Sequence, residues 1–518
     1  MKRNSKAWSQ YEAGKAYKRR IGLYETVRRN ERFYRGDQWY GSGADDLPKP
    51  IFNVIKRVVD YLVCSVASSD VSLSYTDENL PFMTDAEEIR TLREGLELLN
   101  KNAAYRWEKN KMGSKAYRLL TDAAISGDGV LYCYWDPEIR GGQGFEGDIV
   151  TEIIDNSNLF VADVNRADIQ SQDYIILSSR ASVSSLRREA MKYGVSAQEA
   201  MKISADRNGD TLSSDNSAPE LDGDEEAKTA YIIKFWREDG RVVFEKSTQD
   251  CVIRRVYTDA RLYPVAYFNW CPTKNSFHGA SPVTSLISNQ KFINRAYALA
   301  MKHMTDTAFS KVVYDKSKIP EWSNGVGEAI AALGGGNISD AVSVVGVGDM
   351  QDGYMELIES AVSLTKELMG ATESALGNIE AKNTSAILAL QESSKISLEQ
   401  ISAAYYQCIE DMANIWADMM CAYYPKQRFL PYKSGDEISV GEADFELLRR
   451  GLVCARVDVS PVARYSAVGA QNMLDKLLDG GHISPSAYVK RLPAGILRDR
   501  QSLIEEIEYG DKGEERDE

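Results

Sequence analysis

The most informative hydrophobic pattern lies in the second half of the chain, where two helical stretches flank a short insert. Apolar side chains recur at three- and four-residue intervals over residues 281–310 and 351–370, which predicts two helices. Residues 311–348 between them have strand–helix–strand character. A polar break at 371–383 leads into one long helical run, 384–424, which at about 1.5 Å per residue would span about 60 Å. This order suggests a protein shaped by assembly rather than by a catalytic pocket.

The first 280 residues change from a helical pattern to a strand-like one. Helices are predicted over residues 5–36, near 53–67 and over 85–126. One further helix, 184–193, lies among short strands, and residues 206–228 are typical of an acidic, mobile or disordered surface loop. The strands are predicted from runs rich in β-branched and aromatic residues: 130–135, 148–154, 174–178, 231–236, 241–246, 251–257 and 265–270. With a β-like patch and a helical tail after residue 425, this pattern predicts a mainly helical α+β fold.

Composition favours an ordinary globular chain made in the cytoplasm. The 518 residues are 43% hydrophobic and 27% charged, which allows about three domains with ordinary cores. No apolar run reaches the roughly 18–20 residues of a membrane span, and the first residues lack the apolar stretch of a secretory signal. We therefore expect no membrane partner. The net charge of −14 is opposite to that of a conventional DNA-binding domain, which carries a basic patch.

The sequence offers no convincing catalytic, cofactor or metal motif. Residues 142–147 match G-x-G-x-x-G, but they join two predicted strands, so a hairpin is expected there instead of a dinucleotide site. The three histidines, His278, His303 and His482, have no metal partner at helical spacing. We therefore expect no enzyme activity and no cofactor. The alternatives left open are a nuclease whose active site lacks a local motif and a non-viral helical scaffold.

The polar break at 371–383 is the one place where the sequence suggests contact with nucleic acid. Both flanks are strong helices, so the chain could have continued as a helix and does not. Its side chains Asn378, Lys382 and Asn383 could meet phosphates without reading base sequence. An ordinary surface turn is the alternative.

Several short sequence segments, taken in their order along the chain, resemble tailed-bacteriophage portal proteins, the head-to-tail connector family. The resemblance covers most of the chain. The segments are residues 31–39 (ERFYRGDQW), 53–67, 125–129 (ISGDG), 277–283 (FHGASPV), 290–294 (QKFIN), 457–459 and 477–484. The resemblance implies a chain with wing, stem, clip and crown regions. The implied parts are a wing (1–280), stem helices (281–310 and 349–370), a clip (311–348), a tunnel loop (371–383), a long wing helix with a β patch (384–460) and a crown-like tail (461–518).

The resemblance also implies roles for particular residues. In the stem, Ile287, Ile293 and Tyr297 would pack against neighbouring copies. In the clip, Lys316, Lys318 and Trp322 would form the docking site for terminase and adaptor proteins. The break at 371–383 would line the bore as a tunnel loop.

A portal-like chain is expected to work as a structural ring in the virion. The resemblance implies a homo-oligomer of about twelve copies at one capsid vertex. Double-stranded DNA would pass through it during packaging and ejection, and its other partners would be terminase, head-completion proteins, and the major capsid and scaffolding proteins. An acidic balance suits such a channel, because walls that bind phosphate tightly would stall a sliding duplex.

Overall fold

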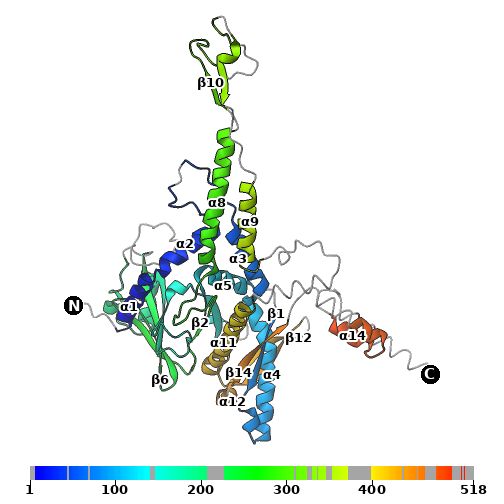
Figure 1. Ribbon diagram of the computed structural model, residues 1–518. Helices are drawn as coiled ribbons and strands as arrows, with labels where there is room; N and C mark the ends of the chain where they lie inside the picture. Colours follow the sequence, from blue (N-terminus) through cyan, green and yellow to red (C-terminus); the bar gives the residue numbers. More distant parts are fainter. Residues whose placement is uncertain are drawn as a thin grey trace.

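The computed structural model combines helices and strands, which confirms the predicted mixture of the two. Helices and strands alternate along most of the chain, and two helices project from a broader body (Figure 1). The structure describes residues 6–43, 46–67, 70–140, 146–206, 227–307, 311–323, 330–334, 337–345, 353–371, 398–434, 437–451, 453–460, 474–492, 503 and 507.

The N-terminal region contains two helices where the sequence pattern predicts one. Helix α1 covers Lys6–Arg20 and α2 covers Leu23–Arg35. The predicted helix over 5–36 is wrong at its centre, because Gly22 adopts a φ of 69°, which glycine tolerates and which interrupts the helix. Helix α3, Val54–Ala67, begins as predicted after Asn53, whose Oδ1 accepts a hydrogen bond from the backbone N–H of Lys56 at 3.0 Å.

The long helical region predicted over 85–126 is likewise two helices. Helix α4 covers Ala86–Lys109, and Asp85 caps its start by accepting hydrogen bonds from two backbone N–H groups. Helix α5 covers Met112–Ser126. Lys111 lies between them with a φ of 53°, in the left-handed region, so the chain changes direction there. The hydrophobic period alone does not predict this break.

The seven predicted strands, together with β4, which was not predicted, form two antiparallel sheets. One sheet has the order β3-β2-β9 and the other β4-β5-β6-β7-β8. Strands β2 and β3 pair antiparallel, as expected of a hairpin, and residues 141–145 lie outside the described residues. The strands are β2 Asp128–Arg140, β3 Glu146–Ile153, β4 Leu159–Val161, β5 Tyr174–Ser182, β6 Lys228–Glu238, β7 Arg241–Ser247, β8 Val252–Tyr257 and β9 Val265–Asn269. The short helices of this region are η2 Asn156–Asn158, α6 Val183–Lys192 and α7 Ala197–Ala200.

The C-terminal half packs back onto the N-terminal half around one large core. Helix α11, Glu399–Tyr423, supplies a row of buried side chains and contacts both β2 and β9. Strand β14, Val453–Ser460, pairs with β1, Asp70–Asp77. The sequence pattern did not predict strand β1. The rest of the predicted helix 384–424 lies outside the described residues. The remaining elements here are η1 Leu80–Phe82, β12 Gln427–Ser434, β13 Glu437–Asp444, α12 Phe445–Arg450 and α14 Pro485–Arg491.

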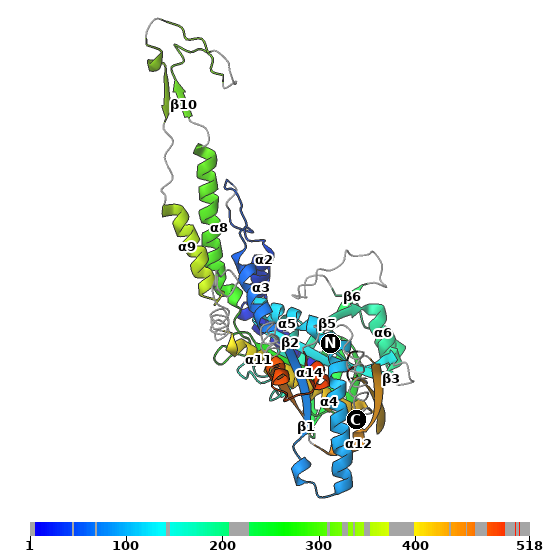
Figure 2. The same cartoon turned by 90° about the vertical axis from the view of Figure 1, so that its right-hand side faces the viewer.

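The projection consists of two helices and a terminal hairpin. Helix α8, Pro282–Thr307, and helix α9, Gly353–Glu367, lie side by side and rise from the body in both views (Figures 1 and 2). At the tip, β10, Lys311–Tyr314, pairs antiparallel with β11, Val342–Val345, near the short helix η3, Ile338–Asp340. These elements occupy the predicted order of helix, insert and returning helix.

Candidate functional site

The projection is held together by few contacts between its two helices. Tyr354 of α9 donates a hydrogen bond from its hydroxyl to the backbone oxygen of Ala296 of α8 at 3.2 Å. Ile358 and Thr365 are buried residues of α9. Helix α8 also packs on α2, α3 and α5, while both helices keep large apolar side chains exposed.

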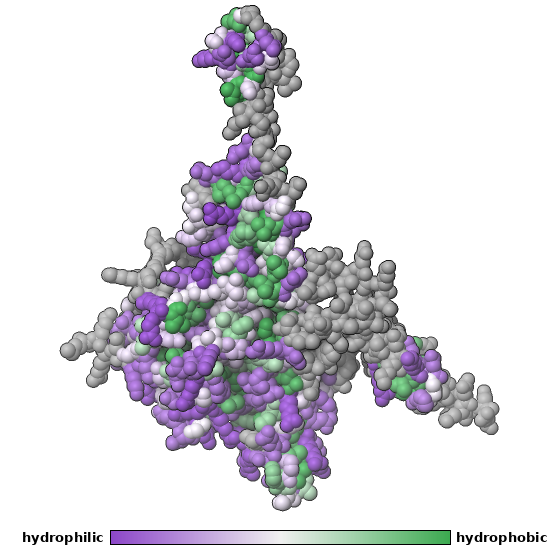
Figure 3. All heavy atoms as spheres, viewed as in Figure 1, coloured by the Kyte–Doolittle hydropathy of each residue, from purple (hydrophilic) through white to green (hydrophobic). Residues whose placement is uncertain are grey.

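The exposed faces of both helices carry large apolar side chains. On α8 these are Phe292, Leu299, Met301 and Met304, on α9 they are Met355, Leu357 and Leu364, and Leu368 directly follows α9. Phe292 and Leu299 are seven residues apart, and so are Leu357 and Leu364, so each pair lies on one side of its helix. Figure 3 shows apolar side chains along the projection, interleaved with hydrophilic ones. Several large exposed apolar side chains on one projection are typical of a surface that contacts another protein.

The two helices also carry opposite charge. Helix α8 has three basic residues and one acidic residue, whereas α9 has three acidic residues and one basic residue. Arg295 on α8 and Glu356 and Glu359 on α9 are exposed. None of these three takes part in an ion pair within the described part of the chain. The α8 surface of one copy is therefore complementary in charge to the α9 surface of another.

The base of α8 is fixed by a buried carboxylate. Asp128 Oδ1 accepts hydrogen bonds from Asn269 Nδ2 at 2.9 Å and from the Gly279 backbone N–H at 2.7 Å. Its Oδ2 lies 2.7 Å from His278 Nδ1 and accepts a hydrogen bond from Asn156 Nδ2 at 3.0 Å. One carboxylate thus joins β2, β9, η2 and the segment that leads into α8.

Three of these contacts determine the ionisation of this carboxylate. Burial alone would raise the pKa of Asp128, but the interactions with His278, Gly279 and Asn156 outweigh it and hold the pKa below its usual range. The carboxylate is therefore charged at neutral pH, and its hydrogen bonds are charge-assisted.

Two glycines allow the backbones to meet at this junction. Gly127 has a φ of 98°, and a Cβ on it would lie 2.6 Å from the backbone oxygen of Gly279. A Cβ on Gly279 would in turn lie 2.8 Å from the backbone oxygen of Gly127. Any larger residue at either position would push the two segments apart.

A second buried polar network fastens α8 to α2 and α3. The side-chain oxygen of Gln290 accepts hydrogen bonds from the backbone N–H groups of Val54 and Ile55 at 2.9 and 3.2 Å, at the start of α3. Its amide nitrogen donates to Asn294 Oδ1 at 2.8 Å, and Asn294 donates to Gln38 Oε1 at 2.6 Å. All three polar side chains are buried, so each depends on the others for its hydrogen bonds.

Five of the seven segments on which the resemblance rests therefore meet at one place. Residues 125–129 contact 277–283 through Asp128 and the paired glycines, while 290–294 contacts 31–39 and the start of 53–67. Segments up to about 250 residues apart in sequence build the base of α8. Their function here is to set the direction in which the projection leaves the body.

Two of the predicted stem contacts with neighbouring copies are wrong. Ile287 and Ile293 are buried inside this chain, in the main core with residues of α3 and α5. Tyr297 is half-buried, and its ring lies 4.3 Å from that of Phe52 of the same chain. The apolar stripe of α8 that contains Ile287 and Ile293 packs inside the chain. A second apolar face of the helix, which includes Leu299, is the exposed one.

The predicted docking residues lie near the tip of the projection. Lys316 and Lys318 are exposed after β10, and Trp322 is half-buried with its ring stacked 5.3 Å from that of Tyr314. The predicted tunnel-loop residues Asn378, Lys382 and Asn383 lie outside the described residues.

The described ranges contain neither a metal-binding cluster nor a membrane-spanning helix. No group of three or more histidine, cysteine, aspartate and glutamate side chains there could hold a metal ion. No helix in the same part of the chain has the length and apolar character needed to cross a membrane.

The central part of the chain is similar to a known family. Residues 256–431 match the family described as phage P22-like portal protein. A solved structure described as "Neck of empty GTA particle computed with C6 symmetry" is similar at 10% identity and a TM-score of 0.36, covering 91% of this chain and 98% of that one. None of the curated proteins compared matches. The resemblance to phage portal proteins is thereby confirmed by a family match over the stretch that contains the projection.

Proposed function

We propose that this chain is a portal protein, a structural subunit of a ring-shaped channel at one capsid vertex of a phage. The supporting observation is the projection, whose helices have exposed apolar faces and opposite net charge. A face of α8 that packs on α9 of the next copy makes a head-to-tail contact, and such contacts close into a ring when the rotation per copy allows it. Burial of Leu299 and Leu364 would supply the apolar part of that contact.

In this proposal each part of the chain has a mechanical role. Helices α8 and α9 form the stem, the region 311–348 forms the clip, and 371–383 forms the tunnel loop that faces the bore. Residues 1–280 form a wing toward the capsid and scaffolding proteins, and 461–518 form the crown. We infer a ring of about twelve copies.

The channel would conduct double-stranded DNA into the capsid during packaging and out of it during ejection. Asn378, Lys382 and Asn383 would meet the phosphate backbone without reading sequence. Lys316 and Lys318, exposed at the tip, would contact terminase during packaging and head-completion proteins afterwards. The protein would then be part of the virion and have no catalytic role of its own.

Measurement of particle mass and shape tests this proposal directly. The purified chain should form particles of several hundred kilodaltons with a central hole in negative stain. The substitution Leu364→Asp should give a folded monomer, because this side chain is 55% exposed and can accept a charge without burying it in the core. A matched control is Phe82→Asp, an exposed apolar residue of η1 that is 83% exposed, which should leave the rings intact.

Two outcomes would contradict the proposal. Rings that form normally with Leu364→Asp would mean that this face of α9 does not join copies. A monomeric or dimeric wild-type chain that cuts DNA with a divalent metal would favour the nuclease alternative instead.

A further inference from the structure

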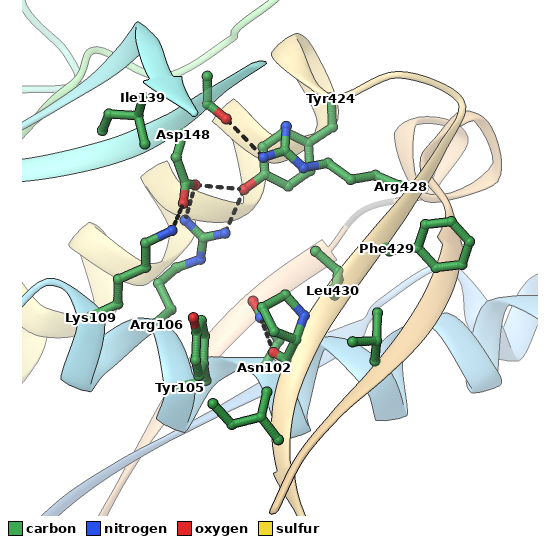
Figure 4. Close-up of a pocket in the computed structure, with 14 residues that line it drawn as sticks. Asn102, Tyr105, Arg106, Lys109, Ile139, Asp148, Tyr424, Arg428, Phe429 and Leu430 are labelled. Carbon is green, nitrogen blue, oxygen red and sulfur yellow. Dashed lines mark hydrogen bonds and ion pairs between the residues drawn. The ribbon is translucent and has the colours of Figure 1, made fainter. Parts of the chain in front are cut away.

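A cavity of about 240 Å³ lies away from the projection, where α4 faces the β12–β13 hairpin. Helix α4 contributes Arg106 and Lys109, and β12 contributes Arg428 (Figure 4). The floor is formed by Asp148 of β3 and Tyr424, which follows α11. Nothing in the portal proposal uses this cavity, since it belongs to the body and not to the stem or clip.

The lining of the cavity has a surplus of positive charge. Three cationic side chains, Arg106, Lys109 and Arg428, face one carboxylate, Asp148. Asp148 accepts hydrogen bonds from Arg106 at 3.1 Å, from Lys109 at 2.5 Å and from the Tyr424 hydroxyl at 3.0 Å. Although burial acts to raise its pKa, the neighbouring cations hold the pKa of Asp148 below its usual range. The carboxylate is therefore charged, and the two cations that pair with it, Arg106 and Lys109, exceed its single negative charge.

The buried guanidinium of Arg106 retains capacity for an anion. The Nε–H of Arg106 is buried and has no hydrogen-bond partner within the part of the chain that the structure describes. The guanidinium of Arg428 lies 3.8 Å above the ring of Tyr424 and donates to the Gly147 backbone oxygen at 2.8 Å. Both arginine side chains are held in place by these contacts, so an incoming carboxylate would meet a preorganised pair of cations.

The rim of the cavity is apolar. Phe429, Ile438 and Val440 of the β12–β13 hairpin line the cavity and are exposed, with Ile438 62% exposed. A free inorganic anion would use the cations and leave this rim in water. A polypeptide with acidic and apolar side chains in close succession would use both surfaces.

We propose that this cavity is a docking pocket for residues 503–518 of this chain, from the same copy or a neighbouring one. That segment has eight acidic and two basic residues, and its first seven positions also include Leu503, Ile504 and Ile507. The acidic segment 206–228 has the same excess of negative charge in more residues and offers fewer large apolar side chains. The apolar rim therefore favours 503–518.

A photo-crosslinking experiment on the full chain tests the assignment. A benzoylphenylalanine at position 438 would form crosslinks that mass spectrometry maps to 503–518. The yield should fall when NaCl rises from about 0.1 M to about 1 M, because the Debye length shortens from about 10 Å to about 3 Å. The same probe at Val252, which is exposed on β8, should not label that segment.

Charge variants of the cavity decide whether the cations matter. Lys109→Glu changes a side chain that is partly exposed, and Arg428→Gln removes a buried cation; each should lower the yield roughly tenfold. Lys274→Glu, an exposed lysine outside the cavity, should have no effect.

Crosslinks to 206–228, to another segment or to none would overturn the assignment, and so would a yield that both cavity variants leave unchanged. Because a crosslink within one copy supports the docking pocket in a monomer as well as in a ring, this test and the test of the portal proposal can fail independently.

Discussion

Replacing Gly127 by alanine adds only one methyl group, but it should weaken the attachment of the projection to the body. The added Cβ would lie 2.6 Å from the backbone oxygen of Gly279, which cannot rotate away. Gly279 itself donates its N–H to Asp128, so moving it disturbs the buried carboxylate as well. The expected effect is a weakened attachment of α8, with the rest of the body intact.

Gly36 provides a matched control for the backbone strain in this variant. It ends α2 with a φ of 97°, against 98° for Gly127 at the end of α5. A Cβ at Gly36 would find only ordinary contacts, the nearest being the Ile51 side chain at 3.7 Å. Gly36→Ala should therefore cost only the strain of a positive φ, about 1–2 kcal/mol. Gly127→Ala should cost about 1–3 kcal/mol more, because a buried hydrogen bond is disturbed too.

Hydrogen exchange measures the difference where it should appear. An additional cost of about 1–3 kcal/mol corresponds to roughly 5–150-fold faster exchange of amides in peptides that cover 277–290, when local opening limits exchange. Gly36→Ala should leave those peptides unchanged and affect only the end of α2. Equal exchange of 277–290 in the two variants would refute the claim that the close approach of Gly127 and Gly279 positions α8.

The remaining predictions concern a carboxylate, a thiol and a loop. Asp128→Asn should destabilise the protein by about 3 kcal/mol at pH 7, because a buried charged partner of His278 is lost. Since the pKa of Asp128 is lowered in the folded protein, its contribution to stability is present above about pH 4 and lost as the pH falls below it. Acid unfolding followed by tryptophan fluorescence should therefore depend less on pH in the variant. Burial raises the pKa of Cys133 to about 12, so iodoacetamide at pH 8 should label exposed Cys64 and spare Cys133 in a mass-spectrometric assay. Deletion of 378–383 should leave rings intact in negative stain and impair DNA packaging; loss of the rings would make this segment structural.

The sequence predicted the projection well, because its signals are local. The helical periods of 281–310 and 351–370 are read within one element, and both correspond to helices in the structure. The breaks at Gly22 and Lys111 were missed, because each depends on a single residue in the left-handed region inside an otherwise helical pattern. Local periodicity indicates which face of a helix is apolar, but it does not indicate where the backbone changes direction.

The functional assignment of side chains was predicted less well, because burial is decided by distant segments. Ile293 lies on an apolar stripe that could have faced a neighbouring copy, yet segments more than 150 residues earlier in the chain cover it. The second apolar face of α8, with Phe292 and Leu299, was visible in the sequence as a seven-residue spacing. The polar residues Gln290 and Asn294 gave no signal of their own, since their partners are backbone groups and side chains of remote helices.

Strand β1 is synthesised long before β14, the strand with which it pairs. Asp70 pairs with Ser460, so β1 leaves the ribosome long before its partner strand exists. At about 5–20 residues per second, β1 would wait roughly 20–75 s for β14. During that time its edge is open to pairing with other chains. Expression of this protein should therefore be sensitive to the rate of translation and to chaperones that cover an unpaired strand, and fragments that end before β14 should aggregate.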